Sequence, residues 1–115
     1  MSGAYRRAGV DRGAAAKAVD LIRDLARGAT RPEVVEGVGG FAGLFRIGEG
    51  RYLAAATDGV GTKLDVARMA GRLSTVGIDL VAMCADDVAC TGAEPLFFLD
   101  CLAMGKVRPE DAAAI

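Results

Sequence analysis

Residues 51–70 read RYLAAATDGVGTKLDVARMA, and this stretch contains the transition that decides the fold. Its first seven residues, 51–57, are mostly apolar and predict a strand. The glycines at 59 and 61 then break the run, and Thr62 stands where the first residue before a helix is expected. The helix is predicted to continue to about Ala70. The sequence therefore predicts a strand that passes through a glycine turn into a helix.

The segment before this stretch predicts a helix and a hairpin. Residues 14–27 carry Ala18, Leu21, Ile22 and Leu25 at the spacing of one helical face, and a glycine follows as a stop. Residues 30–40 are rich in glycine and are predicted to form a loop. A strand is expected over 41–47, joined through a turn at 48–50 to the strand over 51–57.

The segment after it predicts two more helices and a strand. Residues 75–93 are apolar on most sides, which predicts a buried helix. Pro95 ends that helix, and the apolar residues up to Ala103 favour a buried strand in one mixed or antiparallel sheet with the other two. A last helix is predicted from Pro109. The fold class expected is α/β (α+β), a sheet flanked by helices in one domain.

Composition excludes several classes of function. The chain has 115 residues, 14 basic and 15 acidic, so nothing in its charge favours nucleic acid or an anionic membrane as a partner. It has three cysteines and no histidine, which makes a zinc site improbable and predicts free thiols. No apolar run is long enough to span a membrane. The sequence predicts a soluble cytoplasmic protein, and the helix starting at Pro109 close to residue 115 predicts a fragment of a longer one.

The turn Asp58-Gly59-Val60-Gly61-Thr62-Lys63 brings together groups that can bind phosphate. A strand-to-helix turn presents backbone N–H groups, and the Lys63 ammonium can neutralise phosphate oxygens. Asp58 repels phosphate unless a magnesium ion stands between them. The spacing differs from that of the GxxxxGK[ST] phosphate loop. The alternative is an ordinary glycine turn with a solvated lysine.

Carboxylates on the predicted helix 75–93 are a second candidate. Asp79 and Asp86 are seven residues apart and share a face, while Asp87 is rotated by about 100°. Carboxylates on an apolar helix need protons, cations or metals as partners if they are buried. The alternative, an exposed polar stripe, is equally compatible with the sequence. A third feature, the glycine cluster over 37–43, precedes a strand and does not fit a dinucleotide-binding fingerprint.

Several stretches, taken in order, resemble the phosphoribosylformylglycinamidine cyclo-ligase (aminoimidazole ribonucleotide synthetase) family. They are Ala8-Gly9-Val10-Asp11, Arg31-Pro32-Glu33-Val34, Gly39-Gly40-Phe41, the turn from Thr57 to Leu64, Gly77-Ile78-Asp79-Leu80-Val81-Ala82-Met83-Cys84 and Gly92-Ala93-Glu94-Pro95-Leu96-Phe97-Phe98-Leu99-Asp100. The resemblance extends over the whole chain, and over about the first third of a full family member. It implies the N-terminal part of an ATP-binding and dimerisation domain, without the C-terminal domain.

The resemblance implies an ATP-dependent ligase of purine biosynthesis that acts on formylglycinamidine ribonucleotide. ATP phosphorylates the formyl oxygen, and a nitrogen of the same molecule then closes the imidazole ring. The family forms homodimers in which strands of two N-terminal domains build a barrel. The implied magnesium ligands are Asp58 and Asp87, and Gly59, Thr62 and Lys63 correspond to the nucleotide-phosphate turn, with Lys63 as the catalytic cation. The family usually has Asn where this chain has Asp86, which leaves the choice between Asp86 and Asp87 open.

Two other functions fit parts of the sequence. A sister enzyme, of the thiamine-monophosphate kinase or selenophosphate synthase type, would share ATP and magnesium but transfer phosphate differently. A non-catalytic dimerisation module would pair its exposed strand edges with another copy. As a fragment, the chain is expected to be inactive alone.

Overall fold

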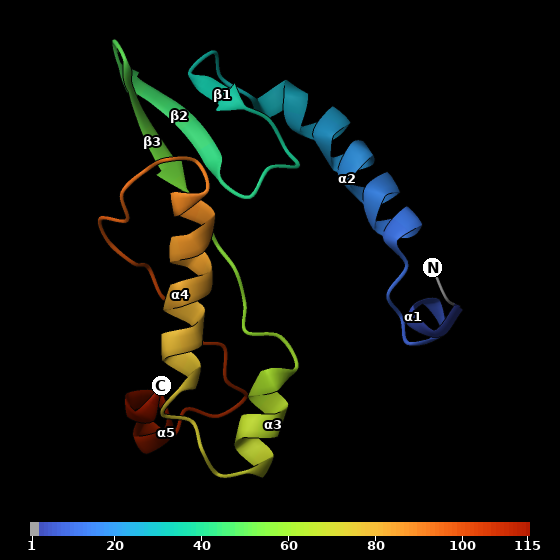
Figure 1. Cartoon of the computed structure of the whole chain (residues 1–115), viewed down its shortest axis with the longest axis vertical. Coiled ribbons are helices and arrows are strands. Elements are labelled where there is room, and N and C mark those ends of the chain that lie inside the picture. The colour runs from blue at the N-terminus through green and yellow to red at the C-terminus, as the bar shows by residue number, and fades with distance from the viewer. Residues whose placement is uncertain (1–2) are drawn as a thin grey trace. The chain divides into compact units, whose positions relative to one another are not determined.

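The computed structural model describes residues 3–115, and these fold as two units that divide between Leu53 and Ala54 (Figure 1). The first unit contains two helices, a 3-10 turn and most of a small sheet. The second contains three helices and the connecting segments between them. The candidate phosphate turn and the three aspartates over 79–87 all belong to the second unit.

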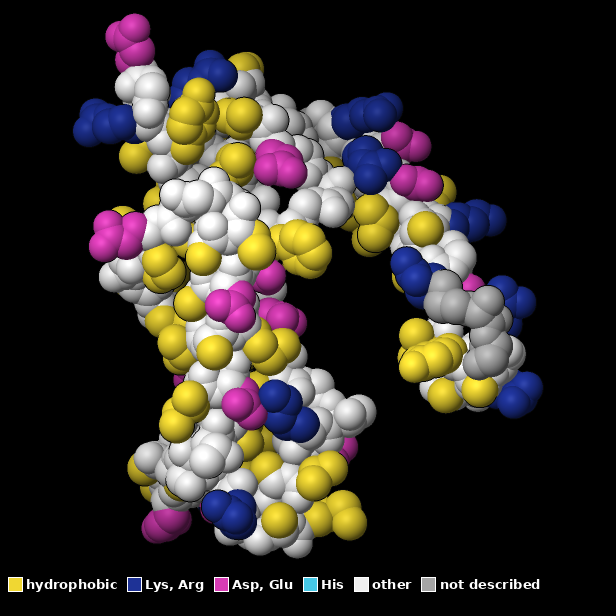
Figure 2. Space-filling model, in the orientation of Figure 1, with side chains coloured by type: hydrophobic (Ala, Val, Ile, Leu, Met, Phe, Trp, Pro, Cys, Tyr) yellow, Lys and Arg dark blue, Asp and Glu magenta, His cyan; other side chains and the backbone are white. Residues whose placement is uncertain are grey.

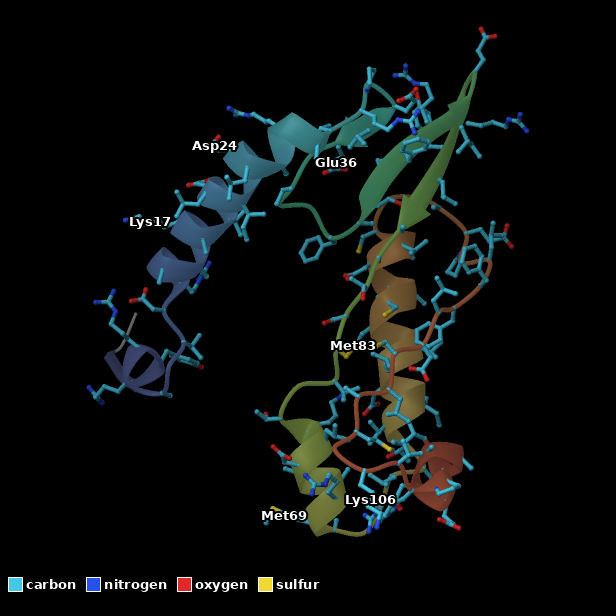
Figure 3. The ribbon with its side chains drawn as sticks, turned by 180° about the vertical axis from the view of Figure 1, so that it is seen from behind. Lys17, Asp24, Glu36, Met69, Met83 and Lys106 are labelled. Carbon is cyan, nitrogen blue, oxygen red and sulfur yellow. The ribbon has the colours of Figure 1, made fainter. Side chains whose placement is uncertain are left out.

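Two helices open the first unit, α1 (Gly3–Arg7) and α2 (Arg12–Ala26), and a 3-10 turn, η1 (Arg27–Ala29), follows them. The predicted helix over 14–27 is confirmed, with a start two residues earlier, whereas α1 was not predicted. Asp11 explains the earlier start, because its Oδ1 atom accepts hydrogen bonds from the backbone N–H groups of Gly13 at 2.9 Å and Ala14 at 3.2 Å. The side chains of Lys17 and Asp24 project from α2 into solvent (Figure 3).

The sheet has three strands in the order β1 (Val34–Glu36), β2 (Gly43–Gly48) and β3 (Arg51–Ala55). Strands β1 and β2 are antiparallel, with Val34 opposite Phe45 and an irregularity before Glu36. The predicted hairpin is confirmed, and Gly50 in its turn has a φ of +63°, a conformation that glycine adopts without strain. The prediction of a loop over 30–40 is wrong for residues 34–36, which form β1.

The second unit contains α3 (Lys63–Met69), α4 (Val76–Ala89) and α5 (Pro109–Ala114). All three were predicted, although α4 ends four residues earlier than expected. The chain after α4 turns back alongside it and reaches α5 near the beginning of α4 (Figure 1). At that point Gly77 approaches the backbone of Ile115 so closely that a Cβ atom would collide with the Ile115 carbonyl oxygen.

The predicted strand from Pro95 to Ala103 is not present. Residues 93–104 have no regular secondary structure, and no described strand pairs with them. Leu96, Phe97 and Leu99 are 74%, 72% and 82% exposed. A strand needs a neighbour whose backbone accepts and donates its hydrogen bonds, and an apolar run does not supply one by itself. The third strand of the sheet is β1 instead.

Few side chains are buried in the part of the chain that the structure describes. Ala42 and Val76 are its buried hydrophobic residues, and many large apolar side chains are exposed over its surface (Figure 2). The prediction that α4 is buried is therefore wrong for most of the helix: Ile78 is 69% exposed and Val81 46%. Within residues 3–115, no helix has the length and apolar character needed to cross a membrane.

Candidate functional site

The glycine turn leaves the end of β3 and leads into α3, as the sequence predicts. Gly61 has a φ of +63°, which a residue with a Cβ atom adopts only with strain, so glycine is favoured at this position before α3. The exposed Asp58 carboxylate folds back on the turn, and its Oδ1 atom accepts a hydrogen bond of 2.7 Å from the Gly59 N–H. One backbone donor of the turn is therefore held by a carboxylate oxygen.

Thr62 occupies the N-cap position of α3, but its hydroxyl makes no capping hydrogen bond. Thr62 and Asp65 do not form a capping box: the Asp65 backbone N–H bonds to the Thr62 carbonyl oxygen, at 3.1 Å, and not to the Thr62 hydroxyl. The reason is conformational: Thr62 has helical angles, φ −65° and ψ −14°, whereas a capping side chain requires an extended residue. The Thr62 hydroxyl is thus not used to begin the helix.

Lys63 is the first residue of α3, and its ammonium reaches α4. Its Nζ atom donates to the Asp79 Oδ2 atom at 3.0 Å, and the two side chains are 49% and 42% exposed. This ion pair joins the beginnings of two helices sixteen residues apart. The sequence shows a signal for it, because a cation at the first residue of a helix lies at the positive end of the helix dipole and benefits from a nearby anion.

The three aspartates of α4 lie in different environments. Asp79 and Asp86 share one face to within about 20°, whereas Asp87 is rotated by about 80° from Asp79. Met83, one turn beyond Asp79 on the same face, projects from the side of α4 in Figure 3. Asp86 is exposed and Asp87 is half-buried, and neither side chain has an ion-pair or hydrogen-bond partner among residues 3–115. The described contacts do not join Asp58 to Asp87.

These oxygen donors fit a hard divalent cation. Carboxylates suit magnesium, which keeps several water molecules and is usually held by one or two carboxylates together with phosphate oxygens. A half-buried carboxylate without a partner, such as Asp87, is also stabilised by a cation. Across the described residues, no group of three or more Asp, Glu, Cys or His side chains is placed to hold a metal ion. A magnesium ion here would therefore complete its shell with water or phosphate.

The candidate residues are four carboxylates and one ammonium, Asp58, Asp79, Asp86, Asp87 and Lys63, and among them the described side-chain contacts join Lys63 with Asp79. Of the donors assigned to phosphate from the sequence, the Gly59 N–H and the Lys63 ammonium each contact a carboxylate, and the Thr62 hydroxyl makes no capping hydrogen bond. Carboxylate and phosphate oxygens accept hydrogen bonds in the same way, so such donors are able to hold an anion. The Lys63–Asp79 pair is a feature that sequence reasoning missed.

The glycine turn, the lysine at the start of α3 and the aspartates of α4 all lie in the part of the chain that matches a known family. Residues 39–115 match the family described as AIR synthase related protein, N-terminal domain, and the chain belongs to that family. The match extends from the glycine cluster before β2 to the end of α5, and so includes every residue of the candidate site.

The chain is also similar to curated relatives that carry the name phosphoribosylformylglycinamidine cyclo-ligase. That of Anaeromyxobacter sp. strain K is 55% identical over 100% of this chain and 34% of the relative. Those of Geobacter metallireducens and Acetivibrio thermocellus are each 51% identical over 96% of this chain, and over 33% and 34% of their own lengths. The chain thus spans about a third of the length of these relatives. No solved structure gave a significant match.

Proposed function

We propose that the chain supplies the nucleotide-phosphate turn of an ATP-dependent cyclo-ligase of purine biosynthesis. The family match and the names of the relatives support the class of enzyme. The observation that carries the proposal is the turn over 58–63, where the Gly59 N–H and the Lys63 ammonium each hold a carboxylate oxygen and can hold a phosphate oxygen in the same way. The substrate proposed is formylglycinamidine ribonucleotide and the product aminoimidazole ribonucleotide.

Each residue has a distinct role in this proposal. Asp58 and Asp87 hold magnesium, with Asp86 as the alternative to Asp87. The Gly59 N–H, the Thr62 hydroxyl and the Lys63 ammonium bind phosphate oxygens of ATP. Magnesium, when bound, offsets the repulsion between these carboxylates and the triphosphate. Lys63 stabilises the negative charge on the phosphoryl group as it leaves ADP.

The proposed reaction has two steps, phosphoryl transfer and ring closure. The formyl oxygen takes the γ-phosphoryl group, and ADP leaves with the electron pair of the broken P–O bond. The ring-forming nitrogen then attacks the activated carbon, inorganic phosphate leaves with the former formyl oxygen, and the nitrogen loses a proton. The residues of this chain act in the first step, by orienting and neutralising the phosphates.

A homodimer in the cytoplasm is part of the same proposal. The sheet has short strands with open edges, and exposed apolar side chains such as Phe41 at 78% and Phe97 at 72% gain from burial against a second copy. These observations support pairing between copies, as in the barrel that the resemblance implies.

A chimera tests the function with this chain intact. The chain replaces the matching third of the Anaeromyxobacter relative, to which it is 55% identical. We expect the chimera to restore growth without added purines in a bacterium that lacks its own cyclo-ligase, and the Lys63→Ala chimera to fail. A chimera that accumulates as folded protein and does not restore growth would contradict the proposal.

A dimerisation module without catalysis is the second candidate, and the exposed apolar surface favours it. Calorimetry with Mg-ATP separates the two functions, because a module that only assembles has no affinity for nucleotide. Binding that is lost in Lys63→Ala supports the ligase. Dimerisation without any nucleotide binding supports the module.

A further inference from the structure

Lys63 and Asp79 both lie at the N-terminal end of a helix, where the helix dipole favours the anion and disfavours the cation. Asp79 lies in the first turn of α4, where the helix dipole stabilises an anion. Lys63 is the first residue of α3, where the dipole disfavours a cation. Helix α3 therefore gains no stability from a lysine at this position, and the contact with Asp79 offsets the unfavourable placement.

We propose that Asp79 is a positioning residue for Lys63, holding the ammonium next to the glycine turn in the orientation that phosphate transfer requires. The proposal rests on the phosphate role proposed for Lys63. An ammonium has three N–H donors, and Asp79 engages it at 3.0 Å, which leaves two donors for phosphate oxygens. The lysine stem is flexible, so a fixed partner removes motions that would otherwise be lost when phosphate binds.

The negative charge of Asp79 allows a positioning role to be distinguished from direct attraction of phosphate. The Lys63–Asp79 pair is neutral overall, and the Asp79 carboxylate repels a nearby phosphate. Removing that carboxylate therefore leaves Lys63 at least as attractive to an anion as before. What the variant loses is the fixed orientation of the Lys63 ammonium. Orientation matters most in the transition state, where a small misplacement of a catalytic group lowers the rate strongly.

The experiment measures binding and turnover separately. Calorimetry of tripolyphosphate with magnesium is carried out on the chain itself, and turnover is measured on the chimera described above. For Asp79→Ala we expect a tripolyphosphate affinity within about twofold of wild type or tighter, and a kcat lowered by about tenfold or more. Lys63→Ala weakens tripolyphosphate binding, and the double variant has the kcat of Lys63→Ala alone, because Asp79 acts only through Lys63.

Two further variants test whether the effect is specific to the carboxylate at position 79. Asp79→Glu retains the carboxylate and is expected to recover part of the lost kcat. Asp65→Ala removes a carboxylate of equal charge from α3, where it is 72% exposed and makes only a 3.5 Å pair with Arg68. This matched control should change kcat by less than about twofold, as expected for an exposed pair.

Three outcomes overturn the inference. If Asp79→Ala weakens binding and lowers kcat together, Asp79 maintains the fold of the turn and does not position Lys63. If the losses in Asp79→Ala and Lys63→Ala multiply in the double variant, the two residues act independently. If wild-type chain binds no tripolyphosphate and the wild-type chimera is inactive, the proposed function has failed and the inference fails with it. The wild-type measurements distinguish this last case from the first two.

Discussion

The start of α2 offers a quantitative test of local structure, because the helix depends on one capping residue. Asp11 accepts hydrogen bonds from the N–H groups of Gly13 and Ala14, and its Oδ2 atom lies 2.9 Å from Arg6 Nε. Helix α2 has no buried residue. Little tertiary packing is then available to hold its first turn if the cap is removed.

The expected cost follows from these contacts. Loss of an N-cap costs about 1 kcal/mol, and loss of the largely exposed ion pair with Arg6 costs between about 0 and 1 kcal/mol. Asp11→Ala should therefore favour opening of the first turn by about 1 to 2 kcal/mol. That corresponds to amide hydrogen exchange roughly 5 to 30 times faster at Gly13 and Ala14.

The assay is amide exchange followed by NMR, with two matched variants. Asp11→Asn keeps the capping oxygen and loses the charge, so exchange should rise by less than in Asp11→Ala. Asp20→Ala removes only the exposed pair with Arg23, at 2.7 Å, and should change exchange by less than about threefold. Exchange in Asp11→Ala no faster than in Asp20→Ala would refute the capping argument.

Three other outcomes can be measured on the chain. Gly77→Ala places a Cβ atom against the Ile115 carbonyl oxygen and should lower stability by about 1 to 3 kcal/mol, seen as a lower thermal midpoint. Gly28→Ala, where a Cβ atom enters open space, should not lower the midpoint. Equal midpoints for the two variants would contradict the close contact at Gly77. The exposed apolar surface predicts species larger than a monomer by light scattering, and Phe97→Lys should shift them toward the monomer. Cys84→Ala should leave Mg-ATP affinity within about twofold, because the thiol is free, and a larger loss would place Cys84 in the site.

Sequence patterns predicted the elements that depend on local chemistry. The helical spacing of Leu21, Ile22 and Leu25 located α2, and Pro109 located the start of α5. The glycines around Glu49 located the hairpin between β2 and β3. In each case the deciding residues lie within a few positions of the element, so no knowledge of distant partners was needed.

Features that depend on distant residues were predicted poorly. The apolar run from Leu96 has strand composition, but strand formation requires a paired neighbour, and none of the described strands provides one. Burial of α4 failed for the same reason, since its apolar composition does not say what covers it. The candidate turn over 58–63 was located correctly, whereas the Lys63–Asp79 pair depends on how α3 meets α4 and was missed.

The shared magnesium site of Asp58 and Asp87 stays a prediction, and replacing each carboxylate tests it. Asp58→Asn and Asp87→Asn should weaken Mg-ATP binding to the chain by about tenfold or more, while tripolyphosphate without magnesium should bind no less tightly than to wild type, because a repelling charge is gone. A loss in Asp86→Asn and none in Asp87→Asn would assign the ligand to Asp86 instead. Equal affinities in all three variants would exclude a magnesium site at these residues.

The most direct test of the central claim is product formation by the purified chimera. Formylglycinamidine ribonucleotide is supplied with ATP and magnesium, and aminoimidazole ribonucleotide, ADP and inorganic phosphate are quantified. The proposed function predicts one ADP for each ring closed, no product when ATP or magnesium is left out, and a strong loss of turnover in Asp58→Asn. A folded chimera that binds Mg-ATP and forms no aminoimidazole ribonucleotide would contradict the account.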